Sequence, residues 1–289
     1  MRDSSFTNLV FEGGGVKGIA YVGALSVLEQ RGIRPHVTAV AGASAGAITA
    51  SLVAAGYSAD ELRQTMLAMD LKQFEDGGLE GPLRLIEHFG WYRGNDFLEW
   101  IGEQLAQKLG SPKVTFAELA GARQIDLRVV IADLSTHASR VFSAAQTPDA
   151  PVALAVRMSM SIPLFFAAVR NDQAVYVDGG TLWNYPIEIF DGPDGCNWQT
   201  LGFHLGLLGQ RQPHPRPISD IAEYAKALYE SIMRTQVDYF ERSDGDVERS
   251  VFIDDFGIRA TDFGLSTELK EKLIESGASA TTAYLDAYT

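Results

Sequence analysis

A β-branched, apolar run at residues 37–41 passes directly into the pentapeptide GASAG at residues 42–46. A pattern of small residues with helical spacing then extends to about residue 55, so the segment predicts a strand, a sharp turn and a helix. Such a G-x-S-x-G turn lifts a serine hydroxyl above the end of a sheet, and the unpaired amides of the next helix favour negative charge beside it. Small residues also suit close helix–sheet packing, so the pentapeptide alone does not assign a role to Ser44.

A glycine-rich loop precedes this unit. Residues 8–11 have the pattern of a buried strand, the sequence EGGGVKG follows at residues 12–18, and helical spacing begins at Ile19. Two consecutive strand–loop–helix units predict parallel strands with helices on both faces of the sheet. Both loops would then lie at the carboxyl ends of their strands, where open α/β sheets gather their sites.

The rest of the chain continues the α/β pattern. Helices are expected near residues 59–69, 115–121, 151–160, 218–240 and 267–276, and strands near residues 127–132, 140–142, 174–177, 201–205 and 250–253. Two apolar segments lie near residues 83–89 and 97–109. Aromatic residues concentrated between residues 89 and 100 suit either core packing or an apolar cleft for an acyl chain. No repeat or long linker divides the chain, so we expect residues 1–289 to form a single domain.

The charge of the chain limits its partners. Asp and Glu number 37 against 24 Lys and Arg, and the net charge of −13 opposes attraction to nucleic acid or to anionic lipid surfaces. Transient contact with a membrane surface would therefore depend on apolar side chains. The lone cysteine, Cys196, excludes an internal disulfide and a cysteine-based zinc site. The N-terminus lacks the form of a secretory signal, so the default location is cytoplasmic, and export that reads no such signal stays open.

The loop at residues 12–18 has three competing uses. Its glycine spacing fits the G-x-G-x-x-G of a dinucleotide site, but the second strand ends in AGAS, without the acid that would bind a ribose. A P-loop fits poorly because glycine follows Lys17 where serine or threonine is required. The adjacent amides of Gly13, Gly14 and Gly15 can instead form an oxyanion hole for Ser44, which we consider the better use.

A serine nucleophile needs a base, and two candidates lie downstream. Asp178 ends an apolar strand and is followed by two glycines, so it is expected at the same sheet edge as Ser44. Burial would raise the pKa of this carboxyl group and suit it to accept the serine proton. His204 completes the Ser, Asp, His order of α/β-hydrolases, but its place in an apolar strand favours a structural role.

The motifs also occur in a recognisable order: GGGVKG at residues 13–18, GASAG at 42–46, RMSMSIP at 157–163, DGG at 178–180 and NYP at 184–186. The combination resembles the patatin-like phospholipases over about residues 8–190. The resemblance implies a three-layer α/β/α fold with a mostly parallel central sheet. It also implies a Ser–Asp dyad without a catalytic histidine, with Ser44 as the nucleophile, Asp178 as the base and Gly13, Gly14 and Gly15 as the oxyanion hole.

The activity implied by the resemblance is that of a lipid acyl hydrolase of the phospholipase A or lysophospholipase type. It would cleave phospholipids or lysophospholipids through an acyl-serine, with no metal and no organic cofactor. Three alternatives stay open: acyl transfer from the same acyl-serine, a Ser-His-Asp esterase that uses His204, and a nucleotide-binding module in which Ser44 is structural. The sequence does not fix the headgroup, the sn position, the chain length, the need for a lid or activator, or the oligomeric state.

Overall fold

A mixed eight-stranded sheet lies at the centre of the molecule, in the strand order β10-β9-β1-β2-β4-β8-β7, with β5 paired to β4 off this path. The computed structural model describes residues 6–69, 71–74, 76, 85, 87–171, 173–209, 217–241 and 243–288. The strands of this sheet are β1 (Asn8–Phe11), β2 (Ala39–Ala43), β4 (Asp126–Asp133), β5 (Ala138–Phe142), β7 (Val169–Arg170), β8 (Val175–Asp178), β9 (Thr200–Leu205) and β10 (Ser250–Ile253). A separate two-stranded sheet pairs β3 (Gly90–Tyr92) with β6 (Leu164–Phe166).

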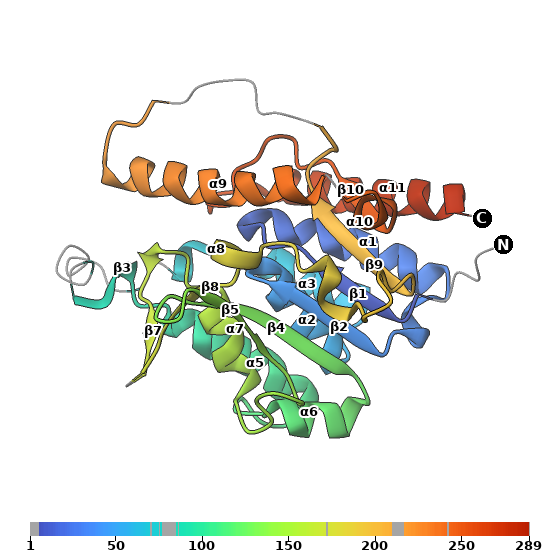
Figure 1. Cartoon of the computed structure of the whole chain (residues 1–289), viewed down its shortest axis with the longest axis horizontal. Helices are drawn as coiled ribbons and strands as arrows, with labels where there is room; N and C mark the ends of the chain where they lie inside the picture. The colour runs from blue at the N-terminus through green and yellow to red at the C-terminus, as the bar shows by residue number, and fades with distance from the viewer. Residues whose placement is uncertain are drawn as a thin grey trace.

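Helices flank the central sheet, as expected for an α/β fold. They are α1 (Ala20–Gln30), α2 (Ala45–Ala55), α3 (Ala59–Ala68), α5 (Asn95–Leu109), α6 (Phe116–Arg123), α7 (Val152–Ser159), α8 (Gly180–Trp183), α9 (Ile221–Phe240), α10 (Asp244–Glu248) and α11 (Thr267–Tyr288). Short 3₁₀ helices add η1 (Gly15–Ile19), η2 (Arg34–His36), η3 (Leu71–Phe74) and η5 (Ile187–Phe190). Figure 1 shows α9 and α11 on one side of the sheet and α5 and α6 on the other.

The sheet has a parallel half and an antiparallel half. From β10 through β9, β1 and β2 to β4, every neighbouring pair is parallel, and β9 and β10 extend this half beyond the two motif-bearing strands. β5 and β8 both run antiparallel to β4, and β7 runs antiparallel to β8. The α/β class with flanking helices is therefore confirmed, and the sheet is mixed.

Helix α11 extends well past residue 276, where the sequence pattern suggested that it ends. The reason is Gly277, which reads in the sequence as a helix stop but serves as a packing contact. A Cβ atom at Gly277 would lie 2.0 Å from the carbonyl oxygen of Ala20 in α1, and a Cβ at Gly23 would lie 1.8 Å from the carbonyl oxygen of Ile274. The two glycines let α1 and α11 pack with their backbones in close contact.

Two other expectations concern loops and aromatic residues. Phe97 is buried, and its ring packs against those of Phe74 and Trp100, with centroids 5.3 and 5.8 Å away, so this part of the aromatic segment serves core packing, whereas Phe89 is 45% exposed. The sequence QPHPRP at residues 212–217 is typical of a flexible surface connection, and all of it except Pro217 lies outside the described residues. Among the described residues, no helix combines the length and apolar character needed to cross a bilayer.

The buried helix α2 begins against strand β1, and this contact requires glycine at position 46. A Cβ atom at Gly46 would lie only 2.1 Å from the Phe11 carbonyl oxygen, which belongs to rigid backbone. We therefore expect Gly46→Ala to lower the free energy of unfolding by about 3 kcal/mol or more, because the strand or the helix must shift. Chemical denaturation followed by circular dichroism measures this loss.

Gly121→Ala is the matched control for that substitution. Gly121 also lies in a helix, α6, but an added Cβ there meets no atom within 4 Å. The change should leave stability unaltered or raise it by up to about 1 kcal/mol, because alanine is the better helix former. Equal stabilities of the two variants would contradict the packing argument.

Candidate active site

Ser44 occupies a strained turn between β2 and α2. Its backbone angles are φ 51° and ψ −124°, a positive φ that costs a residue with a Cβ about 1–3 kcal/mol unless the surroundings hold it. Two hydrogen bonds do so: the Ser44 amide donates to Ser159 Oγ at 2.8 Å, and the Ser159 hydroxyl donates to the Val130 carbonyl at 2.7 Å. The end of α7 and the middle of β4 therefore fix the serine in place.

The Ser44 hydroxyl donates a hydrogen bond to Asp178 Oδ2 at 2.7 Å. The carboxylate is held in turn by the Gly180 amide, which donates to Oδ1 at 2.7 Å, and the Asp178 amide donates to the Ser161 carbonyl at 2.9 Å. Ser44 is 1% exposed and Asp178 is 0% exposed, so the pair lies away from bulk solvent. The two side chains selected from the sequence thus meet.

Asp178 reaches Ser44 by a different route from the one the sequence suggested. The expectation placed both residues at the carboxyl ends of parallel strands, but β8 is antiparallel to β4. The meeting depends on register, because β4 pairs Val130 with Ala43 on one side and Ile131 with Asp178 on the other. The last residue of β8 therefore stops beside the end of β2, one strand away.

Burial raises the pKa of Asp178 to about 7, against the opposing effects of hydrogen bonds with Ser44, the Gly180 amide and Tyr229. A carboxyl group with this pKa can accept and return a proton near neutral pH. Tyr229 comes from α9 and is itself buried, which raises the pKa of its phenol well above the usual value. The tyrosine hydroxyl therefore keeps its proton beside the carboxylate.

The glycine loop lies directly against the serine, since a Cβ atom at Gly13 would come within 3.2 Å of Ser44 Cβ. The Gly13 amide donates to the Asn184 carbonyl at 2.9 Å. Within the described chain, the amides of Gly14 and Gly15 have no hydrogen-bond acceptor. Two of the three amides selected from the sequence therefore make no hydrogen bond among the described residues, and the third is already used.

Glu12 and Asn184 shape this loop, and the sequence reasoning gave Glu12 no role. Asn184 Nδ2 donates to Glu12 Oε1 at 2.9 Å and to the Gly13 carbonyl at 3.1 Å, while Glu12 Oε2 accepts the Leu205 amide at 2.6 Å. Its position, as an acidic residue directly after an apolar strand, could have identified Glu12 as a site residue from the sequence. Tyr229 had no such signal, because it is one of several apolar residues at helical spacing in α9.

His204 lies in an aromatic cluster. Its ring stacks on Phe240 with centroids 5.2 Å apart and also packs against Tyr185 and Phe252. Its Nδ1 lies 3.3 Å from the Gly206 carbonyl. Among the described residues, His204 makes no hydrogen bond with Ser44 or Asp178, so the geometry gives it no direct part in activating the serine.

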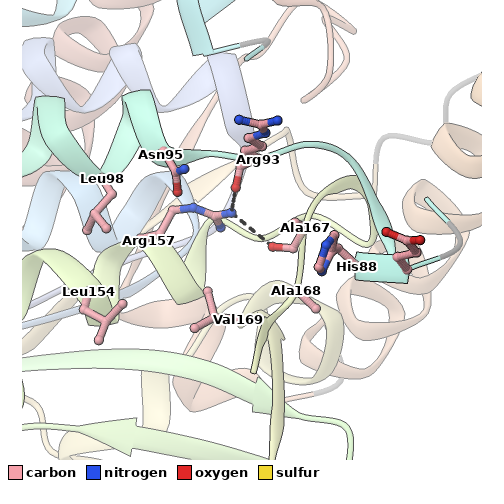
Figure 2. Close-up of a pocket in the computed structure, with 10 residues that line it drawn as sticks. His88, Arg93, Asn95, Leu98, Leu154, Arg157, Ala167, Ala168 and Val169 are labelled. Atoms are coloured by element: carbon pink, nitrogen blue, oxygen red, sulfur yellow. Dashed lines mark hydrogen bonds between the residues drawn. The ribbon is translucent and has the colours of Figure 1, made fainter. Parts of the chain in front are cut away.

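Two cavities are candidates for the substrate site. The first, here called the Arg157 cavity, has a volume of about 670 Å³ and is lined by Glu87, His88, Arg93, Asn95, Leu98, Leu154, Arg157, Ala167, Ala168 and Val169 (Figure 2). Arg157 binds the carbonyls of Arg93, Gly94 and Ala167, and burial lowers its pKa to about 10. This arginine thus ties loop backbones together, and neither Ser44 nor Asp178 lines the cavity.

The second, here called the Met160 cavity, has a volume of about 310 Å³. Its lining includes Ala45, which follows the serine, and Gly15 of the glycine loop. Met160 also lines it, and Met160 Sδ lies 3.6 Å from Ser44 Oγ. Ser44 does not line this smaller cavity, but its chain neighbour Ala45 and the contacting Met160 do.

One side-chain group in the described chain has the composition of a metal site. Asp191, Cys196 and Asp246 have ligand atoms within 4.8 Å of one another. The buried guanidinium of Arg249 already binds both carboxylates, at 2.5 Å from Asp191 Oδ1 and 2.6 Å from Asp246 Oδ1. The arginine thus supplies the positive charge that a cation would bring.

Comparisons with known proteins agree with the motifs. The patatin-like phospholipase family matches residues 9–191. The uncharacterized protein YqhO of Bacillus subtilis (strain 168) is 33% identical over 97% of this chain and 98% of its own length. The probable lipid hydrolase 463L of Invertebrate iridescent virus 6 is 25% identical over 65% of this chain and 64% of its own length.

Among solved structures, VipD from Legionella pneumophila is similar in fold, with a TM-score of 0.65 and 19% identity over 98% of this chain and 67% of the VipD chain. The family match and the viral relative support a lipid acyl hydrolase in general terms. The match also spans both glycine loops and the strand that carries Asp178. The chain therefore belongs to the patatin-like phospholipase family.

Proposed function

We propose that this protein hydrolyses fatty-acyl esters of phospholipids or lysophospholipids through a dyad of Ser44 and Asp178. The observation that carries the proposal is the 2.7 Å hydrogen bond from Ser44 Oγ to Asp178 Oδ2, made by a buried carboxyl group whose pKa is about 7. A base of this pKa, in contact with the serine hydroxyl, can take its proton without a histidine. The strained turn at Ser44 is also typical of a nucleophile elbow.

In the first half of the reaction, Asp178 accepts the hydroxyl proton while Ser44 Oγ bonds to the ester carbonyl carbon. The negative charge that develops on the carbonyl oxygen is held by the free amides of Gly14 and Gly15, and the bonded Gly13 amide fixes the loop. The protonated carboxyl group then gives its proton to the leaving alcohol oxygen as the carbon–oxygen bond breaks. The products of this half are the free alcohol and an acyl-serine.

In the second half, water attacks the acyl-serine. Asp178 takes a proton from the water and returns it to Ser44 Oγ as the acyl bond breaks, which releases the fatty acid. The residues that act are those already described, and none of these steps calls on His204.

The proposal is tested by incubating the purified protein with phosphatidylcholine vesicles and, separately, with lysophosphatidylcholine. Mass spectrometry of the lipid products should show a free fatty acid together with the matching lysophospholipid or glycerophosphocholine. The Ser44→Ala variant supplies the background rate. Product formation at that background rate by the wild-type protein, on both substrates, would contradict the proposal.

Acyl transfer is a second candidate, and the burial of the pair favours it. Because Ser44 and Asp178 are almost inaccessible to solvent, an acyl-serine would meet little bulk water. An alcohol or thiol that enters the site would then compete for the acyl group. Adding glycerol to the same assay separates the two outcomes, since transfer yields an acylglycerol at the expense of the free fatty acid.

The raised pKa of Asp178 predicts the pH dependence of the reaction. The base must be ionised to accept the serine proton, and raising the pH ionises it. We therefore expect kcat/KM to fall about tenfold per pH unit below about pH 7 and to level off above it. Initial rates with a soluble ester between about pH 5 and pH 9 measure the profile, and circular dichroism at each pH confirms that the protein stays folded. A flat profile across this range would contradict Asp178 as the base.

A further inference from the structure

The lining of the Met160 cavity includes residues next to the serine and part of the glycine loop. Gly15 supplies one of the two free amides, and Ala45 follows the nucleophile in the chain. Met160 connects the cavity to the reacting atom, because its sulfur lies 3.6 Å from Ser44 Oγ. Ser44 itself does not line the cavity, so a group attached to a carbonyl carbon at Ser44 would reach this space past the Met160 side chain.

The walls of the Met160 cavity are mainly apolar. Its apolar side chains larger than alanine are Val16, Ile19, Ile48, Met66, Leu67, Met69, Met160, Phe263 and Leu265. Lys270 is the charged residue among the lining residues, and its ammonium donates to the Leu67 carbonyl at 3.2 Å and the Met69 carbonyl at 2.7 Å. These bonds tie the start of α11 to the end of α3. The cavity thus offers apolar surface, and its methionines can adapt to a flexible chain.

The Arg157 cavity is larger, and charged side chains share its lining with apolar ones. Figure 2 shows the charged and polar side chains of Arg93, Asn95 and Arg157 around it, and His88 lies at its other end. Its lining includes no residue of the glycine loop and neither Ala45 nor Met160, all of which line or contribute to the Met160 cavity. Burying methylene groups there would also desolvate charged groups. Of the two cavities, the Met160 cavity is the better match for a hydrocarbon.

We propose that the Met160 cavity binds the acyl chain of the ester and thereby favours chains of medium length. This inference rests on the proposed function of Ser44. Phe263, Leu265 and Lys270 form one wall and lie beyond the 9–191 segment that matches the family, so the match assigns nothing to them. The volume of about 310 Å³ equals that of about ten water molecules, and a methylene group is of similar size, so the cavity has room for about ten carbons.

The test measures kcat/KM for p-nitrophenyl esters of unbranched acids from two to about sixteen carbons, each as a monomer in solution. For the wild-type protein we expect a rise of up to about fourfold per methylene, and no further rise beyond about ten carbons. Leu265→Trp fills the cavity from an irregular, half-buried segment and should lower the ratio of decanoyl to acetyl ester kcat/KM about tenfold. Phe263→Ala enlarges the cavity and should move the optimum to longer chains.

Ala168→Trp is the matched control, because it places the same side chain in the Arg157 cavity (Figure 2). It should leave the ratio of decanoyl to acetyl ester unchanged. The proposal is overturned if this variant lowers the ratio while Leu265→Trp does not, or if the wild-type protein shows no dependence on chain length. Thermal unfolding of each variant confirms its fold, and the opposite expected shifts of Leu265→Trp and Phe263→Ala keep the test decisive if one of them is unstable.

Failure of the proposed function gives a different result. In that case the wild-type protein hydrolyses neither the acetyl nor the decanoyl ester faster than Ser44→Ala. Isothermal titration calorimetry with decanoate then tests the Met160 cavity without turnover. Decanoate should bind the wild-type protein and bind Leu265→Trp at least about tenfold more weakly, whereas equal affinities would overturn the assignment of the cavity.

Discussion

Ser44→Ala is expected to reduce kcat/KM for ester hydrolysis by a factor of about 10³ to 10⁶, because it removes the oxygen that would form the acyl-enzyme. Asp178→Asn should cost about 10³ to 10⁴, since a carboxamide keeps the shape of the carboxyl group but does not accept the serine proton. Fatty-acid release from a soluble ester measures both losses. A burst experiment adds a second readout, because only the wild-type protein should accumulate an acyl-serine.

His204→Gln is the control for these two variants. The side chain lies in the aromatic cluster with Phe240, and its Nε2 is 3.7 Å from Glu12 Oε1. Within the described part of the chain it makes no hydrogen bond with Ser44 or Asp178, so its replacement should change kcat/KM by no more than about threefold. Full activity after either dyad substitution would refute the direct transfer of the proton to Asp178. A loss confined to Ser44→Ala and His204→Gln would instead favour a conventional Ser-His-Asp arrangement.

Arg249→Ala is expected to lower the free energy of unfolding by about 3–5 kcal/mol, the largest effect on stability that we predict. The side chain is completely buried and binds the carboxylates of Asp191 and Asp246 as well as the Asn197 carbonyl. Burial lowers the pKa of this guanidinium, but its hydrogen bonds with both carboxylates raise it above the ordinary value. Removing the cation leaves two mostly buried carboxylates without their partner.

Chemical denaturation of the variant measures this loss, and Arg31→Ala provides the comparison. Arg31 also forms an ion pair, with Asp286, but both side chains are about half exposed, at 43% and 56%. An exposed pair contributes about 0–1 kcal/mol, so that substitution should have little effect. Similar losses for the two variants would show that burial is not what makes the Arg249 interactions important.

The sequence predicted the local structure around the two loops because that structure depends on neighbouring residues. Gly42 and Gly46 permit the bend, and the three glycines after Glu12 leave the backbone amides accessible. Both features follow from the lack of a Cβ atom in glycine, and glycines can be recognised directly in the sequence. The α/β fold was also predictable, since it follows from alternating strand and helix patterns.

The contacts between distant segments were harder to predict. The direction of β8 depends on its pairing with β4, and no local pattern distinguishes an antiparallel neighbour from a parallel one. Tyr229 approaches Asp178 because α9 packs beside α8, and that packing involves residues far apart in the chain. In the sequence, Gly277 is typical of a residue that ends a helix. Its role as a packing contact is apparent only once α1 is placed against it. The catalytic assignment of Ser44 and Asp178 stays a prediction that the variants above will test.

The pairing of β8 with β4 makes the proposed chemistry sensitive to strand alignment. Alternate residues of a strand face opposite sides of its sheet, so sliding β8 by a single position would turn the Asp178 carboxylate away from Ser44. The catalytic rate of this protein would therefore depend on the alignment of β8 with β4 as well as on the identity of the reacting residues. Inserting or deleting one residue within β8 should inactivate the enzyme, whereas length changes in the hairpin between β7 and β8 should be tolerated as long as the alignment survives.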